Sequence, residues 1–510
     1  MGKKHDVDIG YVFIIILFIV YFLVFEIINI FYVRYGIGAD EAQTGICSKI
    51  FWEAKSLHPS DFFAWTESGA FSLATIGAII YGLTGSMLAA QGVSPAIITV
   101  LILLAIYRLF KYIGISKKGI ALGLLSILCI PLGFMSQMIS FLSYAAYSVC
   151  VLTMFLVLTD YIQLVSGDLK HKRITIIFHV LLAVANGCNS SRGVLVVYMP
   201  LFILACTRYL LKAIHAKKVY EKKEARAVVF TFALTALSYL STYLPYSSRT
   251  SVSKAFRRSP VKLVTEVMPM LNNWIGINKT SNIYLISMLI LIIIMAIGVA
   301  VYILYKRGID DRHQLVIAYL WCDLLLTIVM LSITQTDVTE RYFFMSYFIL
   351  TFSIVFAFEK LRDKSKFVTN IGIGCILIYA CLNLIIFYVP ILNNSTDDPE
   401  YDAISNFMLD NGYFYGYSDY MNANRLTVYA DGDVQISAVH IEDLSIWRWT
   451  TDVSWYRPCL PEDMKTAYVI PKADINAFSK VLKKHPDIKE GYETDNYMIY
   501  VSDKNYSSVD

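Results

Sequence analysis

Long apolar runs separated by short basic segments dominate the first 392 residues. The first run covers residues 9–32, and ten more follow at about 94–113, 119–138, 139–164, 174–190, 193–212, 227–246, 283–305, 315–334, 341–360 and 367–392. A helix needs roughly 20 apolar residues to cross a bilayer, and its backbone must be hydrogen-bonded internally there. The pattern therefore predicts a polytopic α-helical membrane protein of about eleven spans.

The apolar stretch 71–90 does not fit this series. Its glycines and serines make a weak lipid-facing helix, and a span here would place the next basic clusters on the wrong side of the membrane. We predict a re-entrant or interfacial segment within a long outer loop, residues 33–93. An ordinary span here, with a later span miscounted, is the alternative.

Residues 393–510 have the shorter pattern of a soluble domain. Helical spacing is expected at 400–410, ending at Gly412, and at 474–484, with strands at 467–470 and 496–501. Residues 425–430 and 434–439 alternate around Asp431-Gly432, which predicts a β-hairpin. We therefore expect a C-terminal α/β domain attached to a membrane region, residues 1–392.

Charge supports this division. The chain is 16% charged, well below the roughly 25% of soluble domains. Residues 393–510 carry 20 of the 40 acidic and 10 of the 44 basic residues, so they are net −10 and the rest is net +14. With an odd number of spans the basic clusters face the cytoplasm, which predicts a plasma-membrane protein with a cytoplasmic N-terminus and an extracytoplasmic C-terminal domain.

The nine cysteines predict no disulfide framework and no metal site. Most lie in apolar runs, where cysteine acts as a small hydrophobic residue. Cys47 and Cys459 both fall in predicted outer segments, which leaves a disulfide between them open. The chain has no P-loop, and we expect no nucleic-acid partner and no cofactor; a divalent metal is neither indicated nor excluded.

Asp40 and Glu41 follow the first span at once, just outside the membrane. Such carboxylates can simply mark the water boundary. They can also serve as a general base, because a sugar hydroxyl or amine must lose its proton as it attacks an anomeric carbon. Both interpretations remain open on this feature alone.

The arrangement resembles the GT-C superfamily of membrane glycosyltransferases, which use polyprenyl-phosphate sugars. Asp40-Glu41 matches the position of the Asp-Glu motif in its protein O-mannosyltransferase and lipid A aminoarabinose transferase branch, and the glycine-rich segment 82–113 is similar too. By this resemblance Asp40 is the catalytic base and Glu41 its helper. It implies hexosyl or pentosyl transfer to a glycan, lipid or protein acceptor of the cell envelope.

Cationic side chains on the outer side are candidates for holding the donor's phosphate, since Arg and Lys stabilise charge on a phosphoryl leaving group. The second large outer loop, 247–282, is unusually basic, although attraction to anionic lipid headgroups would also explain it. The predicted substrate-binding residues are Arg34, Arg192, Arg249, Arg257, Arg258, Lys262, Glu340 and Arg341. Glu340 and Arg341 open a late span from outside.

Aromatic residues are frequent in the C-terminal part, among them Tyr417, Tyr420, Trp447, Trp449 and Tyr456. Rings of this kind stack on sugars, but they also form the core of small domains, and the core interpretation is favoured. The function predicted overall is glycosyl transfer from a polyprenyl-phosphate donor. The alternative is a non-catalytic transporter of polysaccharide or lipid, or an envelope assembly factor.

Overall fold

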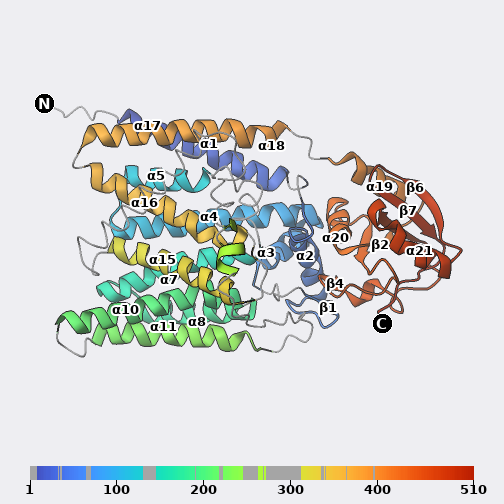
Figure 1. Ribbon diagram of the computed structural model, residues 1–510, viewed down its shortest axis with the longest axis horizontal. Coiled ribbons are helices and arrows are strands. Elements are labelled where there is room, and N and C mark those ends of the chain that lie inside the picture. Colours follow the sequence, from blue (N-terminus) through green and yellow to red (C-terminus); the bar gives the residue numbers. More distant parts are fainter. Residues whose placement is uncertain are drawn as a thin grey trace.

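The computed structural model describes residues 8–32, 34, 37–64, 71–129, 145–189, 191–216, 222–244, 262–267, 269–270, 312–334, 338, 340–362, 365–393 and 397–509. Figure 1 shows two parts: helices that run side by side, and a mixed sheet with its own helices at one end of them.

The helical part has a helix in each predicted span except 283–305. Its helices are α1 (Ile9–Phe31), α4 (Met87–Ile113), α5 (Lys117–Leu128), α7 (Ala145–Ser166), α8 (Lys172–Asn189), α9 (Ser191–Gly193) with η1 (Val194–Tyr198) and α10 (Met199–Ala216), α11 (Lys222–Ser241), α15 (Arg312–Ile333), α16 (Phe344–Arg362), and α17 (Lys366–Asn383) with η4 (Leu384–Tyr388) and α18 (Val389–Asn393). Six helical stretches of the described chain are long and apolar enough to cross a membrane. The predicted span 283–305 lies outside the described residues.

The stretch 71–90 divides into two elements. Helix α3 (Leu73–Thr84) starts at the Ser72 cap and ends at Gly85, where φ is +71°. Its 12 residues extend only about 18 Å, too short to cross a bilayer. This length agrees with the re-entrant or interfacial interpretation for α3, whereas residues 87–90 belong to the long helix α4.

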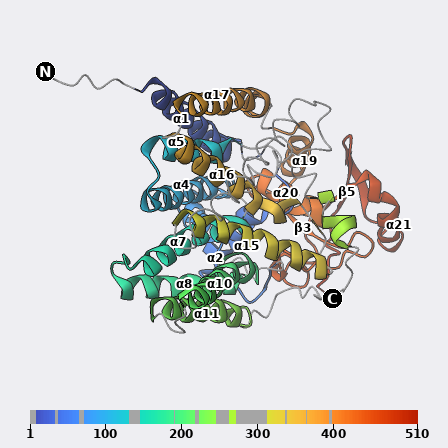
Figure 2. The ribbon, with the colours of Figure 1, turned by 60° about the vertical axis from the view of Figure 1, so that its left-hand side comes forward.

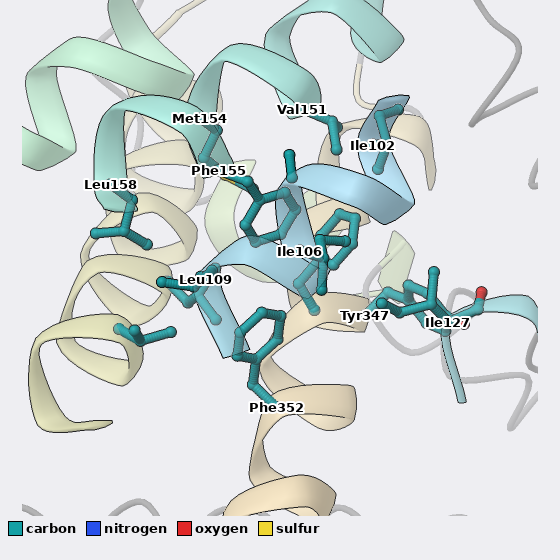
Figure 3. Packing of buried hydrophobic residues seen from close by; sticks show 14 of the residues in the cluster. Ile102, Ile106, Leu109, Ile127, Val151, Met154, Phe155, Leu158, Tyr347 and Phe352 are labelled. Carbon is teal, nitrogen blue, oxygen red and sulfur yellow. Dashed lines mark hydrogen bonds between the residues drawn. The ribbon is translucent and has the colours of Figure 1, made fainter. Parts of the chain in front are cut away.

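Large apolar side chains from α4, α7 and α16 fill the centre of the bundle (Figure 3). The ring of Phe352 lies 4.8 Å from that of Phe110 and 5.7 Å from that of Phe155, measured between centroids. Ile102, Ile106 and Leu109 occupy one face of α4, at helical spacing. Because this face is buried and the outer helices expose apolar side chains, the bundle is built for a lipid surround.

Several ion pairs join residues near those helix ends that Figure 1 shows on the side away from the sheet. Arg312 contacts Asp168 at 2.9 Å, Arg208 contacts Glu224 at 2.9 Å, and Lys118 contacts Asp8 at 3.0 Å. Asp160 is shared between Arg108 and the buried His179 ring, whose Nε2 lies 2.8 Å from Asp160 Oδ2. This end therefore holds much of the basic charge that the sequence predicts to be cytoplasmic.

The C-terminal part is a five-stranded mixed sheet in the order β3-β2-β5-β7-β6. Its strands are β2 (Tyr415–Ser418), β3 (Gln435–Ala438), β5 (Thr466–Pro471), β6 (Lys489–Glu493) and β7 (Tyr497–Ser502); its helices are α19 (Pro399–Asp410), α20 (Tyr420–Tyr429) and α21 (Ile475–Lys484), with short turns η5 (Val453–Trp455) and η6 (Lys472–Asp474). Strands β2 and β3 are parallel, and β7 is antiparallel to β5 and β6.

The predicted hairpin at 425–439 is wrong. Residues 425–429 belong to α20, which begins at the Asp419 cap and buries Ala423 and Leu426 one turn apart. Asp431 and Gly432, with φ of +53° and +87°, end this helix and lead into β3. Because β2 and β3 are parallel, the chain needs a crossover between them, and α20 supplies it.

Cys47 and Cys459 are both free thiols, the first buried in α2 (Gln43–Ala54) and the second exposed. The disulfide that the sequence left open is not formed.

Close helix packing generates a stability prediction. A Cβ added to Gly187 in α8 would lie 2.1 Å from the carbonyl oxygen of Ser238 in α11. Gly187→Ala should therefore lower the free energy of unfolding by about 1–3 kcal/mol, the usual cost of overpacking. The measurement is the thermal unfolding midpoint in nanodiscs.

The matched control is Gly372→Ala in α17, where an added Cβ meets no described atom within 4 Å. Alanine there should leave the midpoint unchanged or raise it slightly. Equal midpoints for the two variants would contradict the close contact between α8 and α11.

Candidate functional site

Asp40 and Glu41 lie in a turn between α1 and α2, at the end of the bundle that faces the sheet. The turn is closed by the Ala42 amide, which donates to the Gly38 carbonyl at 3.0 Å, and by the Thr44 amide, which donates to that of Glu41 at 3.2 Å. The Glu41 carboxylate folds back over Gly38: a Cβ added to Gly38 would lie 2.2 Å from Glu41 Oε2. Both acidic residues are half-buried, so they are neither core groups nor freely solvated ones.

The side chain of Gln91 fastens this turn to α4. Its Nε2 donates to the Glu41 carbonyl at 2.7 Å, and its Oε1 accepts from the Gly45 amide at 2.7 Å. Gln91 is buried, with 8% of its surface exposed. A buried backbone group needs a partner, and this one amide satisfies two. The position of the acidic pair is thus set by a long membrane helix.

The C-terminal part contributes the next contact. The hydroxyl of Tyr420, the first residue of α20, donates to Asp40 Oδ1 at 3.0 Å. The Gln43 Nε2 lies 3.3 Å from the same oxygen and 3.3 Å from the Tyr420 hydroxyl. Burial raises the pKa of Tyr420, and the negative charge of Asp40 raises it further. The phenol therefore stays protonated and acts as a donor.

Other contacts dock the C-terminal part around this turn. Asp431 Oδ1 accepts from the Leu88 amide at 2.8 Å and from the Ser86 hydroxyl at 3.1 Å, so it caps α4 from across the interface. Strand β1 (Phe62–Phe63) pairs antiparallel with β4 (Thr451–Asp452). Figures 1 and 2 both place α20 between the bundle and the sheet. The acidic turn thus lies where the two parts meet.

The cationic candidates Arg34, Arg192 and Lys262 each have partners of their own. Arg34 is 3.2 Å from Asp397 and stacks over the Tyr429 ring at 5.0 Å. Arg192, in α9, lies 4.4 Å from the centroid of Tyr147.

Lys262 is buried beside η2 (Leu263–Val267). Its Nζ donates to the Thr334 carbonyl at 2.8 Å and lies 3.9 Å from Glu266. Glu340 and Arg341 belong to the short helix η3 (Glu340–Phe343) that precedes α16. Arg249, Arg257 and Arg258 lie outside the described residues. The substrate-binding roles of all these side chains stay predictions.

No family model and no curated protein matches this chain. Solved structures do match this chain. The crystal structure of ArnT from Cupriavidus metallidurans bound to undecaprenyl phosphate aligns with 97% of this chain and 98% of its own, with a TM-score of 0.55 and 12% identity. The chain has the ArnT fold. The structure of the same protein in the apo state covers 95% and 97%, with a TM-score of 0.46 and 12% identity.

The likeness to ArnT extends over the bundle and the C-terminal sheet alike, because almost nothing of either chain is left out. The fold that the predicted resemblance implies is confirmed by this alignment. A polytopic helical protein with a C-terminal α/β part, as the pattern predicted, is confirmed with it.

The sequence pattern did not predict the contact between Tyr420 and Asp40. The signal available was weak: Tyr420 was only one of many aromatic residues in the tail. Among the others, Tyr417 and Tyr456 are core residues, with 1% and 0% exposed surface, as the favoured interpretation predicted. Trp447 stays 37% exposed beside Tyr420.

Two further polar groups lie within the ArnT-like bundle. Asp323 in α15 is fully buried, and within the described part of the chain neither of its carboxylate oxygens has a hydrogen-bond partner. His179 packs against Asp160, in line with a polar packing role. No group of three or more His, Cys, Asp or Glu side chains among the described residues is arranged to hold a metal ion.

The two hydrogen bonds that Gln91 makes to Glu41 and Gly45 lead to a stability prediction. Gln91→Leu removes both hydrogen bonds and leaves the Glu41 carbonyl and the Gly45 amide without this partner. An unsatisfied buried group costs about 1–3 kcal/mol, and the Glu41 carbonyl is only partly buried, so the free energy of unfolding should fall by about 2–4 kcal/mol. Urea or thermal unfolding of the full chain in nanodiscs measures this.

Ser94→Ala on the same helix is the control. The Ser94 hydroxyl donates to the Ala90 carbonyl within α4, so its loss frees no group of the turn. If the unfolding midpoint of Gln91→Leu is as high as that of Ser94→Ala, the two Gln91 hydrogen bonds do not stabilise the fold.

Proposed function

We propose that this chain is a glycosyltransferase that transfers a sugar from a polyprenyl-phosphate donor to an acceptor of the cell envelope. The observation that carries the proposal is the half-buried Asp40-Glu41 turn at the bundle end of an ArnT fold. It is supported by the undecaprenyl phosphate to which the solved ArnT is bound.

In this proposal Asp40 is the general base. The acceptor's hydroxyl or amine forms a bond to the anomeric carbon and gives its proton to the Asp40 carboxylate. The bond from that carbon to the donor's phosphate oxygen breaks, and its electron pair leaves with the polyprenyl phosphate. Attack opposite the leaving group inverts the anomeric centre. Glu41, next in the chain, helps to hold the acceptor.

The cationic side chains would stabilise the leaving phosphate. Developing charge on the phosphate is stabilised by guanidinium or ammonium groups aimed at it. Arg192 and Lys262 are partly or fully withdrawn from solvent, which strengthens their fields. Arg34, Arg249, Arg257, Arg258 and Arg341 remain candidates for the same phosphate, and Glu340 remains a candidate for another contact with the substrate.

We further propose that the C-terminal part lies on the outer face of the membrane and the N-terminus in the cytoplasm. This orientation is supported by the basic side chains at the opposite end of the bundle, such as Arg108, Arg208 and Arg312. Positive charge near helix ends is retained on the cytoplasmic side. The acceptor would then meet Asp40 outside the cell.

A turnover assay tests the reaction. Purified protein in nanodiscs is given a panel of radiolabelled polyprenyl-phosphate hexoses and pentoses with an envelope lipid and glycan extract, and loss of label from the donor is followed. Asp40→Asn should lower kcat roughly 10²–10⁴-fold, the usual contribution of a general base, while donor binding persists.

The control for this assay is Asp61→Asn, an exposed carboxylate of the same outer loop. It should leave turnover unchanged. Turnover that survives Asp40→Asn would move the base elsewhere, with Glu41 next. Absence of turnover and of donor binding across the panel would overturn the proposal and favour the non-catalytic transporter or assembly factor.

The exposed Cys459 thiol tests the orientation. In intact cells a membrane-impermeant maleimide should label the wild-type protein and not Cys459→Ser. Labelling of Cys459 only after lysis would place the C-terminal part in the cytoplasm.

A further inference from the structure

We infer that Tyr420 is a positioning residue for Asp40, so that the C-terminal part completes the catalytic site of the membrane part. This rests on the proposed function, because it assigns to Tyr420 the task of orienting the proposed base. The two residues are 380 positions apart in the chain.

Two donors reach the same carboxylate oxygen. The Tyr420 hydroxyl lies 3.0 Å from Asp40 Oδ1, and the Gln43 amide nitrogen lies 3.3 Å from it. Because both converge on Oδ1, they restrict rotation of the carboxylate about its Cβ–Cγ bond. A base must be held in a narrow range of directions toward the proton that it removes. The two donors meet this requirement.

The tyrosine is itself held firmly. Its ring stacks with that of Trp447 at 6.2 Å and 18°, and meets that of Trp449 edge-on at 6.2 Å. The preceding Asp419 caps α20 by accepting from the Met421 amide at 2.7 Å. A donor on a fixed ring at a helix start can set the direction of its acceptor, whereas a mobile side chain would follow it.

The hydrogen bond from Tyr420 to Asp40 is not needed merely to hold the membrane part and the C-terminal part together. The Asp431 cap, the pairing of β1 with β4, and the Arg34–Asp397 ion pair already join the two parts. A tyrosine hydroxyl directed at the carboxylate of the acidic turn adds a constraint on that carboxylate. The aromatic residues behind it therefore serve the site rather than only the core of the C-terminal part.

The test compares Tyr420→Phe with Tyr429→Phe in the full chain. Tyr429 is on the same helix, but its hydroxyl contacts Asp398 and Asp402. Phenylalanine keeps both rings, so each variant loses one hydroxyl. With the labelled donor panel, Tyr420→Phe should lower kcat about 10- to 100-fold, as expected for a misaligned catalytic group, with the donor KM unchanged.

Tyr429→Phe should keep the wild-type kcat. A kcat of Tyr420→Phe equal to that of Tyr429→Phe would overturn the inference. So would an effect of Tyr420→Phe confined to the donor KM, because that would indicate a binding or structural role.

A second measurement does not depend on turnover. Thermal midpoints of the wild type, Asp40→Ala, Tyr420→Phe and the double variant form a double-mutant cycle. If the side chains are coupled, the double variant loses less than the sum of the two single losses. Additive losses would overturn the inference even if the protein is a transferase. Coupling in a protein without turnover would count against the proposed function and leave the contact intact.

Discussion

The buried amide of Gln91 is the interaction on which the proposed site depends. Where the chain leaves the regular hydrogen-bond ladder of a membrane helix, the freed backbone groups need partners. Gln91 donates to the Glu41 carbonyl in the turn before α2 and accepts from the Gly45 amide in the first turn of α2, each at 2.7 Å. The acidic pair is thereby tied to α4, whose other face lies in the centre of the bundle.

The elements around these two hydrogen bonds pack against one another and form the surface on which the C-terminal part docks. Helix α2 packs on α3 and α4, and Gly45 in α2 lies close to Val428 in α20. The C-terminal part docks on the surface that these elements form, and Asp431 closes it by capping α4. Ion pairs gather at the opposite end of the bundle, among them those of Arg312 and Arg208. One end is thus suited to chemistry on a lipid-borne substrate and the other to a basic membrane face.

Much of the fold could be predicted because local patterns determine it. The apolar runs around α1, α4 and α15 are each long enough to cross a bilayer. Gly412, with φ of +75°, follows the end of α19 where the pattern predicted it. The hairpin prediction failed because residues 425–430 alternate like a strand, while the parallel pairing of β2 and β3 requires a helix between them.

The site was predictable only in part. Asp40 and Glu41 stood out through their position after the first span and through resemblance to a family motif. Gln91 and Tyr420 did not, since their roles arise from contacts across 50 and 380 residues of sequence. A lone glutamine in an apolar helix and one tyrosine among many give no local signal. Only the packing of α2 against α4 and α20 brings them to the turn.

The most direct test of the proposed site is a cryo-electron microscopy structure of the full chain with a polyprenyl-phosphate sugar bound. We expect the phosphate on the sheet-facing side of the bundle, in contact with Lys262 or Arg192, and the anomeric carbon within reach of an acceptor held by Asp40. A donor bound at the end where Arg312 and Arg208 lie, or with its sugar remote from Asp40, would contradict the proposed site.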